Sequence, residues 1–154
     1  MGTTAFDIKE LLIANAKLRP ALSDLTNDDA IWDSAYSSTQ RPRKLLWFGE
    51  ILWAYDQNVA FGRTPASREE EYNIRVGIEI NDNDDDQSDA NAKAKAIMQD
   101  LEDMVGHYDL FAAAAPRGLV RIGIVPIGLG EGPGGAEGGR AAFMALQVNV
   151  TARK

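Results

Sequence analysis

The sequence predicts an α+β domain, in which a mostly antiparallel, four-stranded sheet has helices packed on one face. Two observations carry this prediction. Apolar residues alternate at every second position in several separate segments, which is the pattern of strands with one buried face. Between these segments lies a long one in which apolar residues recur at spacings of three and four, which is the pattern of an amphipathic helix. A strand followed directly by such a helix begins a two-layer arrangement of sheet on helix.

Length and composition limit the classes of protein that fit. The 154 residues suit one domain over residues 1–154, and 45% apolar with 25% charged residues is ordinary for a soluble protein. The net charge of −7 argues against affinity for nucleic acid or anionic lipid. The chain has no cysteine, which excludes disulfides and thiolate sites. No segment approaches the roughly 20 apolar residues of a membrane helix, and no signal-peptide pattern opens the chain.

A first helix is expected near the N-terminus. Thr4 and Asp7 have the spacing of a capping box, and Pro20 should end the helix. The apolar stripe of this helix consists of Ile8, Leu11, Leu12 and Ala16. The polar segment 22–43 is interpreted as a long connection. The residues expected to attach it to the core are Ile31, Trp32 and Tyr36.

Residues 45–80 predict a hairpin of two strands. Aromatic and β-branched residues favour a strand over 45–55. The side chains expected to share one of its faces are Trp47, Ile51, Trp53 and Tyr55. Residues 56–68, with Gly62 and Pro65, predict a loop. In the second strand, the buried face consists of Tyr72, Ile74, Val76, Ile78 and Ile80, and the residues that face away are Asn73, Arg75 and Glu79.

An acidic turn and the main helix follow. The turn contains Asp82, Asp84, Asp85 and Asp86. It lacks the spacing of a calcium-binding EF-hand loop, because position six is Gln87 and position twelve is Lys93. We interpret it as a turn stabilised by the positive end of the next helix. That helix is expected over 88–105 with an apolar stripe of Ala90, Ala94, Ile97, Met98, Leu101, Met104 and Val105. Residues 111–115 are expected either to extend this helix or to form a short turn before Pro116.

The C-terminal part predicts a second hairpin. A strand is expected over 119–125, and a last strand buries Ala142, Met144, Leu146, Val148 and Val150. Between them, the glycine-rich segment 128–139 predicts a mobile, exposed loop. The spacing of Gly130, Gly132 and Gly135 matches that of a dinucleotide-binding loop. However, Glu131 and Glu137 would repel phosphate and a strand follows in place of a helix, so we interpret the segment as a hairpin loop.

No group of residues has the composition of an active site. His107 is the only histidine, and at a helix end it is expected to cap carbonyl groups. The basic residues Arg41, Arg43 and Lys44 are interpreted as a solvated entrance to a strand. We therefore predict no catalytic, cofactor-binding or metal-ligating residue and no enzymatic activity.

The order of these elements resembles the tail terminator family of long-tailed phages. The resemblance covers roughly residues 5–154 and rests on three details. The first is the strand with Trp47, Phe48 and Gly49, which leads through a loop to the strand that ends at Ile80. The second is the helix that directly follows that strand. The third is the final hairpin, in which a Gly-Pro-rich loop ends at Gly139 and runs into the alternating C-terminal strand.

The resemblance implies a non-enzymatic subunit of the virion, found in the host cytoplasm during assembly. Its partners would be copies of itself in a ring, typically of six, the tail tube protein and a head-completion or neck protein. DNA would pass through the ring without specific binding, past the acidic residues Asp82, Asp84, Asp85 and Asp86. The residues expected at partner interfaces are Arg63, Arg68, Gly130, Glu131, Gly132, Gly134, Gly135 and Glu137. Two other classes remain open: a different neck or connector subunit, and a small-molecule-binding α+β domain or enzyme.

Overall fold

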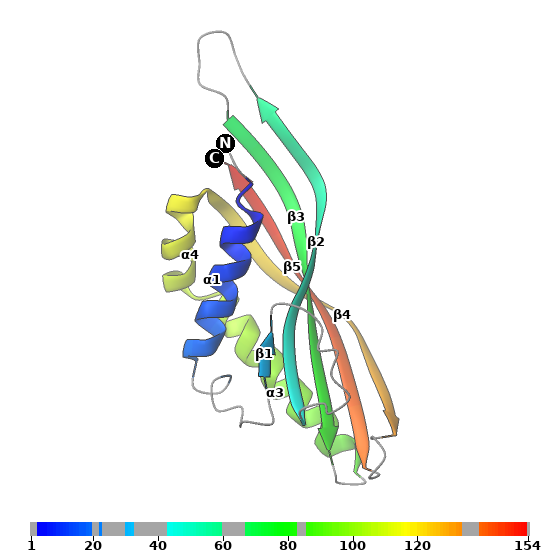
Figure 1. Cartoon of the computed structure of the whole chain (residues 1–154). Helices are drawn as coiled ribbons and strands as arrows, with labels where there is room; N and C mark the ends of the chain where they lie inside the picture. Colours follow the sequence, from blue (N-terminus) through cyan, green and yellow to red (C-terminus); the bar gives the residue numbers. More distant parts are fainter. Residues whose placement is uncertain are drawn as a thin grey trace.

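The computed structural model describes residues 3–19, 22, 30–32, 43–59, 67–82, 86–133 and 139–153 (Figure 1). The helices are α1 (Ala5–Leu18), α3 (Gln87–Val105), α4 (Tyr108–Ala114) and the 3₁₀-helix η1 (Ala115–Arg117). The strands are β1 (Ala30–Trp32), β2 (Lys44–Val59), β3 (Ser67–Asp82), β4 (Leu119–Pro133) and β5 (Arg140–Arg153). They form one sheet in the order β1-β2-β3-β5-β4. The predicted α+β class is confirmed.

The four long strands are antiparallel, as predicted. The central pair, β3 and β5, keeps one register from Glu69 opposite Arg153 to Asp82 opposite Arg140. The short β1 adds a fifth strand, parallel to β2, in the segment that the sequence had indicated as a plain connection. Three residues are too few to show an alternating pattern, so this strand has no signal in the sequence.

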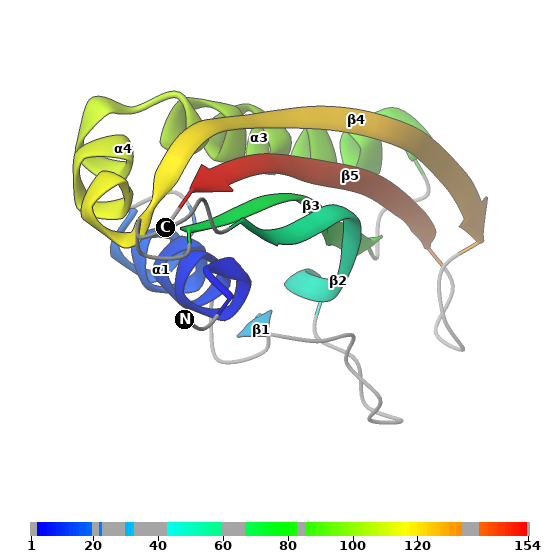
Figure 2. The ribbon, with the colours of Figure 1, turned by 90° about the horizontal axis from the view of Figure 1, so that it is seen from above.

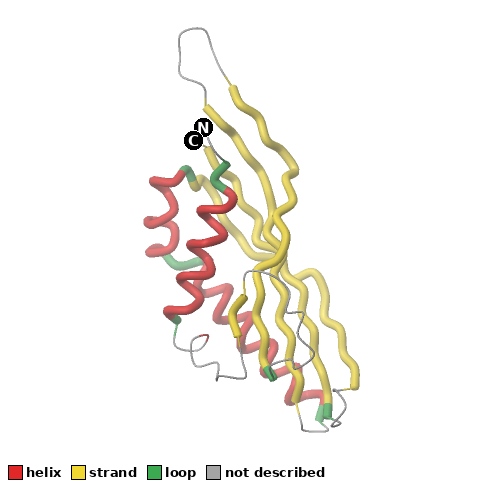
Figure 3. The backbone as a smooth tube through the Cα atoms, in the orientation of Figure 1, coloured by secondary structure: helices red, strands yellow, loops and turns green. Residues whose placement is uncertain are grey.

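The helices cover one face of the sheet, which Figures 1 and 3 show edge-on. The predicted inward faces of β3, β5, α1 and α3 are confirmed, because their apolar residues form one buried cluster. The largest fully buried members include Ile8, Leu12, Phe48, Ile74, Ile78, Leu101 and Leu146. Each such side chain contributes about 1.5–3 kcal/mol of burial free energy. None of the described helices covers the opposite surface of the sheet, which we call the helix-free face.

The predicted face of β2 is wrong in part. Its inward residues are Leu46 and Phe48, opposite Ile78 and Val76 of β3, and then Ile51 and Trp53, opposite Ile74 and Tyr72. Register shifts between Phe48 and Ile51 and between Trp53 and Tyr55 reverse the alternation, so Trp47 and Tyr55 lie on the helix-free face. A bulge adds one residue without moving the partner strand, which changes the face of all residues beyond it. Lys9 of α1 donates a 2.9 Å hydrogen bond to the carbonyl of Gly49 inside the first irregularity.

Both predicted hairpin loops are too long. β2 continues to Val59 and β3 begins at Ser67, so the connection is 60–66 and lies outside the described residues. β4 continues to Pro133, and its residues 128–133 pair with β5. Only 134–138 lie outside the described part of this hairpin. Glycine indicates a loop because it has no side chain to pack, yet the backbone ladder to β5 needs no side chain.

Two local predictions need correction, and the burial of a third residue was not predicted. Thr4 makes no capping hydrogen bond to α1, because its hydroxyl is bound to Glu70 and Tyr72. His107 caps an amide and not a carbonyl group, since its Nδ1 accepts a 3.2 Å hydrogen bond from the backbone N–H of Asp109 at the start of α4. Glu79 is on the helix-free face as predicted, but it is buried there.

Candidate assembly surfaces

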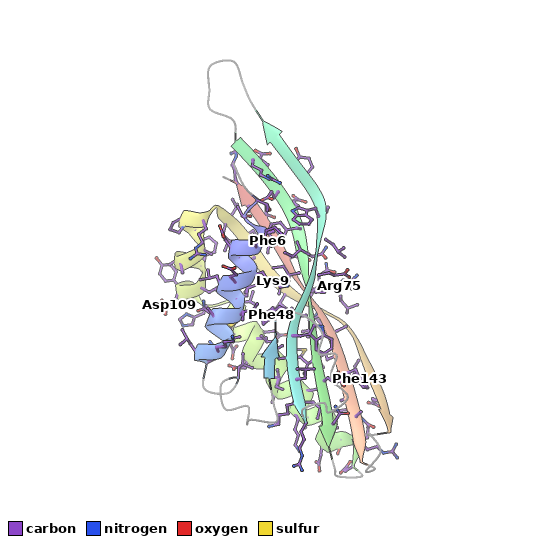
Figure 4. The ribbon with its side chains drawn as sticks, viewed as in Figure 1. Phe6, Lys9, Phe48, Arg75, Asp109 and Phe143 are labelled. Carbon is purple, nitrogen blue, oxygen red and sulfur yellow. The ribbon has the colours of Figure 1, made fainter. Side chains whose placement is uncertain are left out.

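The helix-free face has an apolar half near the end of β3. Trp47 of β2 lies over Gly77 of β3, where the backbone has no side chain to hold the indole away. Phe143 of β5 is 41% exposed and stands over Gly130 of the neighbouring β4. Figure 4 shows Phe143 and Arg75 on the side of the sheet away from the helices. An exposed aromatic side chain on an uncovered sheet face is typical of a surface that another protein covers.

Gly77 tests the packing of this half. A Cβ at Gly77 would lie 2.0–2.4 Å from three atoms of the Trp47 ring. We therefore expect Gly77→Ala to displace the indole and to lower the free energy of unfolding by about 1–3 kcal/mol. Urea titration followed by tryptophan fluorescence measures both effects. The control is Gly123→Ala on β4, where an added Cβ would meet nothing within 4 Å. Equal stability of the two variants would contradict the packing of Trp47 on Gly77.

The other half of the helix-free face is polar and hollowed. An open concavity of about 470 Å³ crosses β3, β5 and β4, and the polar side chains that line it are Glu71, Asn73, Arg121, Asn149 and Thr151. Oδ1 of Asn73, which lines the concavity, and Nε of Arg75, two residues further along β3, are buried without a hydrogen-bond partner in the described structure. Buried polar atoms in native proteins are nearly always satisfied. This half therefore suits contact with a polar partner surface or ordered water.

A buried carboxylate holds the N-terminus of α1 on β3. The Glu70 side chain is 0% exposed. Its carboxylate accepts hydrogen bonds from the Thr3 hydroxyl and, at 2.8 Å each, from the Thr4 backbone N–H and hydroxyl. Nε of Arg68 lies 3.2 Å away. Burial acts to raise the pKa of Glu70, but the hydrogen bonds and the charge of Arg68 outweigh it and hold the pKa below its usual value.

An aromatic cluster is exposed beside this carboxylate. Trp53 of β2 meets Phe6 of α1 edge-on, with ring centroids 6.5 Å apart, and meets Tyr72 at 6.4 Å. Phe6 and Trp53 are 59% and 42% exposed, whereas Tyr72 is buried. Burial raises the pKa of Tyr72, whose hydroxyl lies 3.1 Å from that of Thr4. The cluster is therefore anchored on its inner side and open to a partner on its outer side.

At the opposite end of the sheet, side chains join α3 to the last hairpin. The Asp86 carboxylate caps α3 by accepting from the Ser88 N–H at 2.9 Å, and the hydroxyl and N–H of Ser88 lower the pKa of Asp86. Nδ2 of Asn91 donates to Glu131 of β4 at 2.5 Å. Nε2 of Gln87 donates to the carbonyl of Ala141 in β5 at 2.9 Å.

The structure separates the residues that the sequence indicated for interfaces. Arg68 binds Glu70, whereas Gly130, Glu131 and Gly132 are strand residues of β4. Arg63, Gly134, Gly135 and Glu137 lie outside the described residues. Arg68 and the residues 130–132 lie at opposite ends of the sheet, because Glu69 pairs with Arg153 at one end and Asp82 pairs with Arg140 at the other. Sequence reasoning missed the Phe6–Trp53 cluster, because only the tertiary structure brings α1 beside β2. It placed Asn73 and Arg75 on one face of β3, but the burial of their polar atoms has no signal in the sequence.

The acidic residues contribute to local structure where they are described. Asp82 is the last residue of β3 and Asp86 caps α3, whereas Asp84 and Asp85 lie outside the described residues. Over the described ranges, no group of three or more His, Cys, Asp or Glu side chains is placed to hold a metal ion. None of the helices searched in those ranges is long and apolar enough to cross a membrane.

The failed calcium-loop spacing leads to a direct prediction. Millimolar calcium is expected to leave the melting temperature unchanged, because Asp86 already serves α3 as its cap. A site of micromolar affinity would add about 4 kcal/mol at a thousandfold excess of calcium over its dissociation constant. Differential scanning fluorimetry with calcium and then with EDTA measures this. An upward shift that EDTA reverses would overturn the interpretation of residues 82–86 as a capped turn.

Comparison with known proteins identifies the fold. No protein-family model matches the chain, and no curated protein matches it. Among solved structures, it is similar to a chain of the "Virion of native gene transfer agent (GTA) particle", with a TM-score of 0.51 and 15% sequence identity. The match covers 94% of this chain and 94% of that chain. The chain therefore shares its fold with that chain over nearly its whole length.

Proposed function

We propose that this chain is a structural, non-enzymatic virion protein that forms a homo-oligomeric ring, a hexamer, at the head-proximal end of a phage tail tube. The ring ends polymerisation of the tube and joins the tail to the head or neck. The observation that carries the proposal is the fold shared with a chain of a virion particle over 94% of both chains. The order of elements that resembles the tail terminator family supports the specific role.

The two ends of the sheet give the subunit two places for contact with different partners. The end of β2 and β3, with the Phe6–Trp53 cluster nearby, carries Arg68 and leads to Arg63 in 60–66. The other end carries Gly130, Glu131 and Gly132 and leads to Gly134, Gly135 and Glu137. In this proposal, one end contacts the tail tube protein and the other contacts the head-completion or neck protein.

DNA passes through the ring without specific binding. The support is the net charge of −7, together with Asp82 and Asp86 at one end of the sheet and with Asp84 and Asp85, which come between them in the sequence. Carboxylates repel phosphate, so acidic residues at the lumen keep the duplex from adhering to the ring.

Deletion of the gene from the genome that encodes the particle tests the function. Electron microscopy of the lysate is expected to show tails of irregular length and heads without tails, and wild-type protein supplied from a plasmid should restore uniform particles. Tails of uniform length that lack heads would identify a neck or connector subunit in place of a terminator. Normal particles would overturn both assignments. Electron microscopy of the purified protein tests the ring independently, because a small-molecule-binding domain requires no ring.

A further inference from the structure

β4 presents one unpaired edge of the sheet. It is the outermost strand on its side and pairs with β5 alone. The described elements place no strand along its other edge, which leaves a row of backbone N–H and C=O groups without strand partners. Its charged residues are Arg121 and Glu131. Its apolar residues that are 46–55% exposed are Val120, Val125, Ile127 and Leu129. Such an edge is a template for another strand.

The other side of the sheet has a second unpaired edge. β1 pairs only with residues 45–47 of β2. From residue 48 to 59, β3 is the only described strand beside β2. This stretch carries two charged residues, Glu50 and Asp56, and over 48–55, where side chains are described, its exposed large apolar residues are Leu52, Trp53 and Tyr55. Both edges are therefore long, weakly charged and without a described strand partner, although the Gly49 carbonyl of β2 already accepts from Lys9, and apolar side chains are exposed beside each edge.

The directions of the strands allow these edges to meet in a ring. Each neighbouring pair in the series β2, β3, β5, β4 is antiparallel, so β2 and β4 run in opposite directions. Rotation about an axis along the strands keeps those directions in every copy. β4 of one copy then meets β2 of the next as an antiparallel neighbour, and the alternation continues across the boundary.

The curvature of the sheet also favours a ring. The register shifts lie in the outer pairs, β2 with β3 and β4 with β5, while the central pair of β3 and β5 has one unbroken register. Bulges bend the strand that carries them and increase its twist. Figure 2 shows the long strands β4 and β5 bent along their lengths when the sheet is seen from above. A curved sheet with free edges on both sides can close on copies of itself.

We infer that the edge of residues 48–59 in β2 pairs, antiparallel, with β4 of a second copy of this chain, and that this pairing is the subunit interface. The inference rests on the proposed function, because it names the contact that builds the proposed ring. A two-fold pairing of β4 with β4 would satisfy one edge and leave the edge of β2 unpaired. The head-to-tail pairing satisfies both edges in every subunit.

Disulfide mapping tests the pairing. The chain has no cysteine, so every cross-link comes from introduced residues. Glu50→Cys or Ala54→Cys on β2 is combined with Arg121→Cys, Val125→Cys or Ile127→Cys on β4. After mild oxidation, at least one double variant is expected to give a ladder of covalent oligomers on a non-reducing gel, while each single variant stays monomeric. Dimers of a single β4 variant, or no ladder in any double variant, would overturn the inference.

A charge on the edge provides an independent test. A lysine side chain on an edge strand opposes pairing with another strand. Ile127→Lys on β4 is expected to raise the concentration for half-assembly at least about tenfold in sedimentation velocity, with an unchanged circular dichroism spectrum. The control is Leu18→Lys at the end of α1, where the native side chain is 80% exposed and far in sequence from both edges. This control should assemble normally.

The outcomes separate this inference from the proposed function. Rings that form normally from Ile127→Lys and give no cross-link between β2 and β4 would overturn the edge pairing and leave the terminator proposal in place. Native protein that stays monomeric at high concentration would overturn the edge pairing and the ring. The gene-deletion phenotype decides the terminator role separately, because tail length is measured without reference to the interface.

Discussion

Ile78→Asp is expected to unfold the subunit or to leave it close to its unfolding midpoint. Ile78 is 0% exposed on β3 and belongs to the cluster between the sheet and the helices. Loss of its burial costs about 1.5–3 kcal/mol, and a carboxylate without a partner in that position costs several more. The sum, on the order of 5 kcal/mol, equals much of the stability of a typical domain. Urea denaturation followed by circular dichroism measures it.

Arg75→Asp on the same strand is the matched control. Arg75 lies on the helix-free face, is only partly buried and is outside the cluster between the sheet and the helices, so the new carboxylate does not enter the apolar core. We expect its unfolding midpoint to remain near that of the native protein. If both variants unfold at the same urea concentration, the assignment of the two faces of β3 is incorrect.

Glu70→Ala is expected to lower the free energy of unfolding by about 3 kcal/mol. The substitution removes the acceptor of three hydrogen bonds from Thr3 and Thr4, and it leaves Arg68 without its carboxylate partner at 3.2 Å. Thr4 is 0% exposed, so its amide and hydroxyl cannot turn to water. Thermal melting of Glu70→Ala beside Glu71→Ala, an exposed neighbour on the other face, measures the difference. Equal melting temperatures would exclude a stabilising role for the Glu70 carboxylate.

The same carboxylate gives the fold a dependence on pH. The pKa of Glu70 is lower in the folded chain than its usual value, so the folded state favours the ionised form. The contribution of the ionised Glu70 to the free energy of unfolding is complete above the usual carboxyl pKa of about 4.3. It is lost as pH falls through the lower pKa of the folded chain. The gap in melting temperature between native protein and Glu70→Gln should therefore be largest near neutral pH and should narrow below about pH 4. A gap that grows on acidification would contradict the direction of this pKa shift.

The pattern of apolar residues in the sequence was sufficient to predict the class of the fold and most of its core. The elements β3, β5, α1 and α3 each bury one face along their whole length. The period of two residues in the strands and of 3.6 residues in the helices therefore appears undisturbed in the sequence. Tyr72, Ile78, Leu101 and Leu146 are buried where that period places them. No neighbouring element needed to be known for these predictions.

Only the tertiary structure decided the face of β2, the length of β4 and the arrangement of the candidate surfaces. The bulge near Gly49 depends on pairing with β3 and on the hydrogen bond from Lys9, which are contacts over long sequence distances. Residues 128–133 form a strand because β5 lies beside them and supplies the backbone hydrogen-bond partners. A glycine-rich sequence does not predict this pairing. In the same way, Thr4 binds Glu70 in place of its own helix, because only folding brings a buried carboxylate 66 residues away into reach.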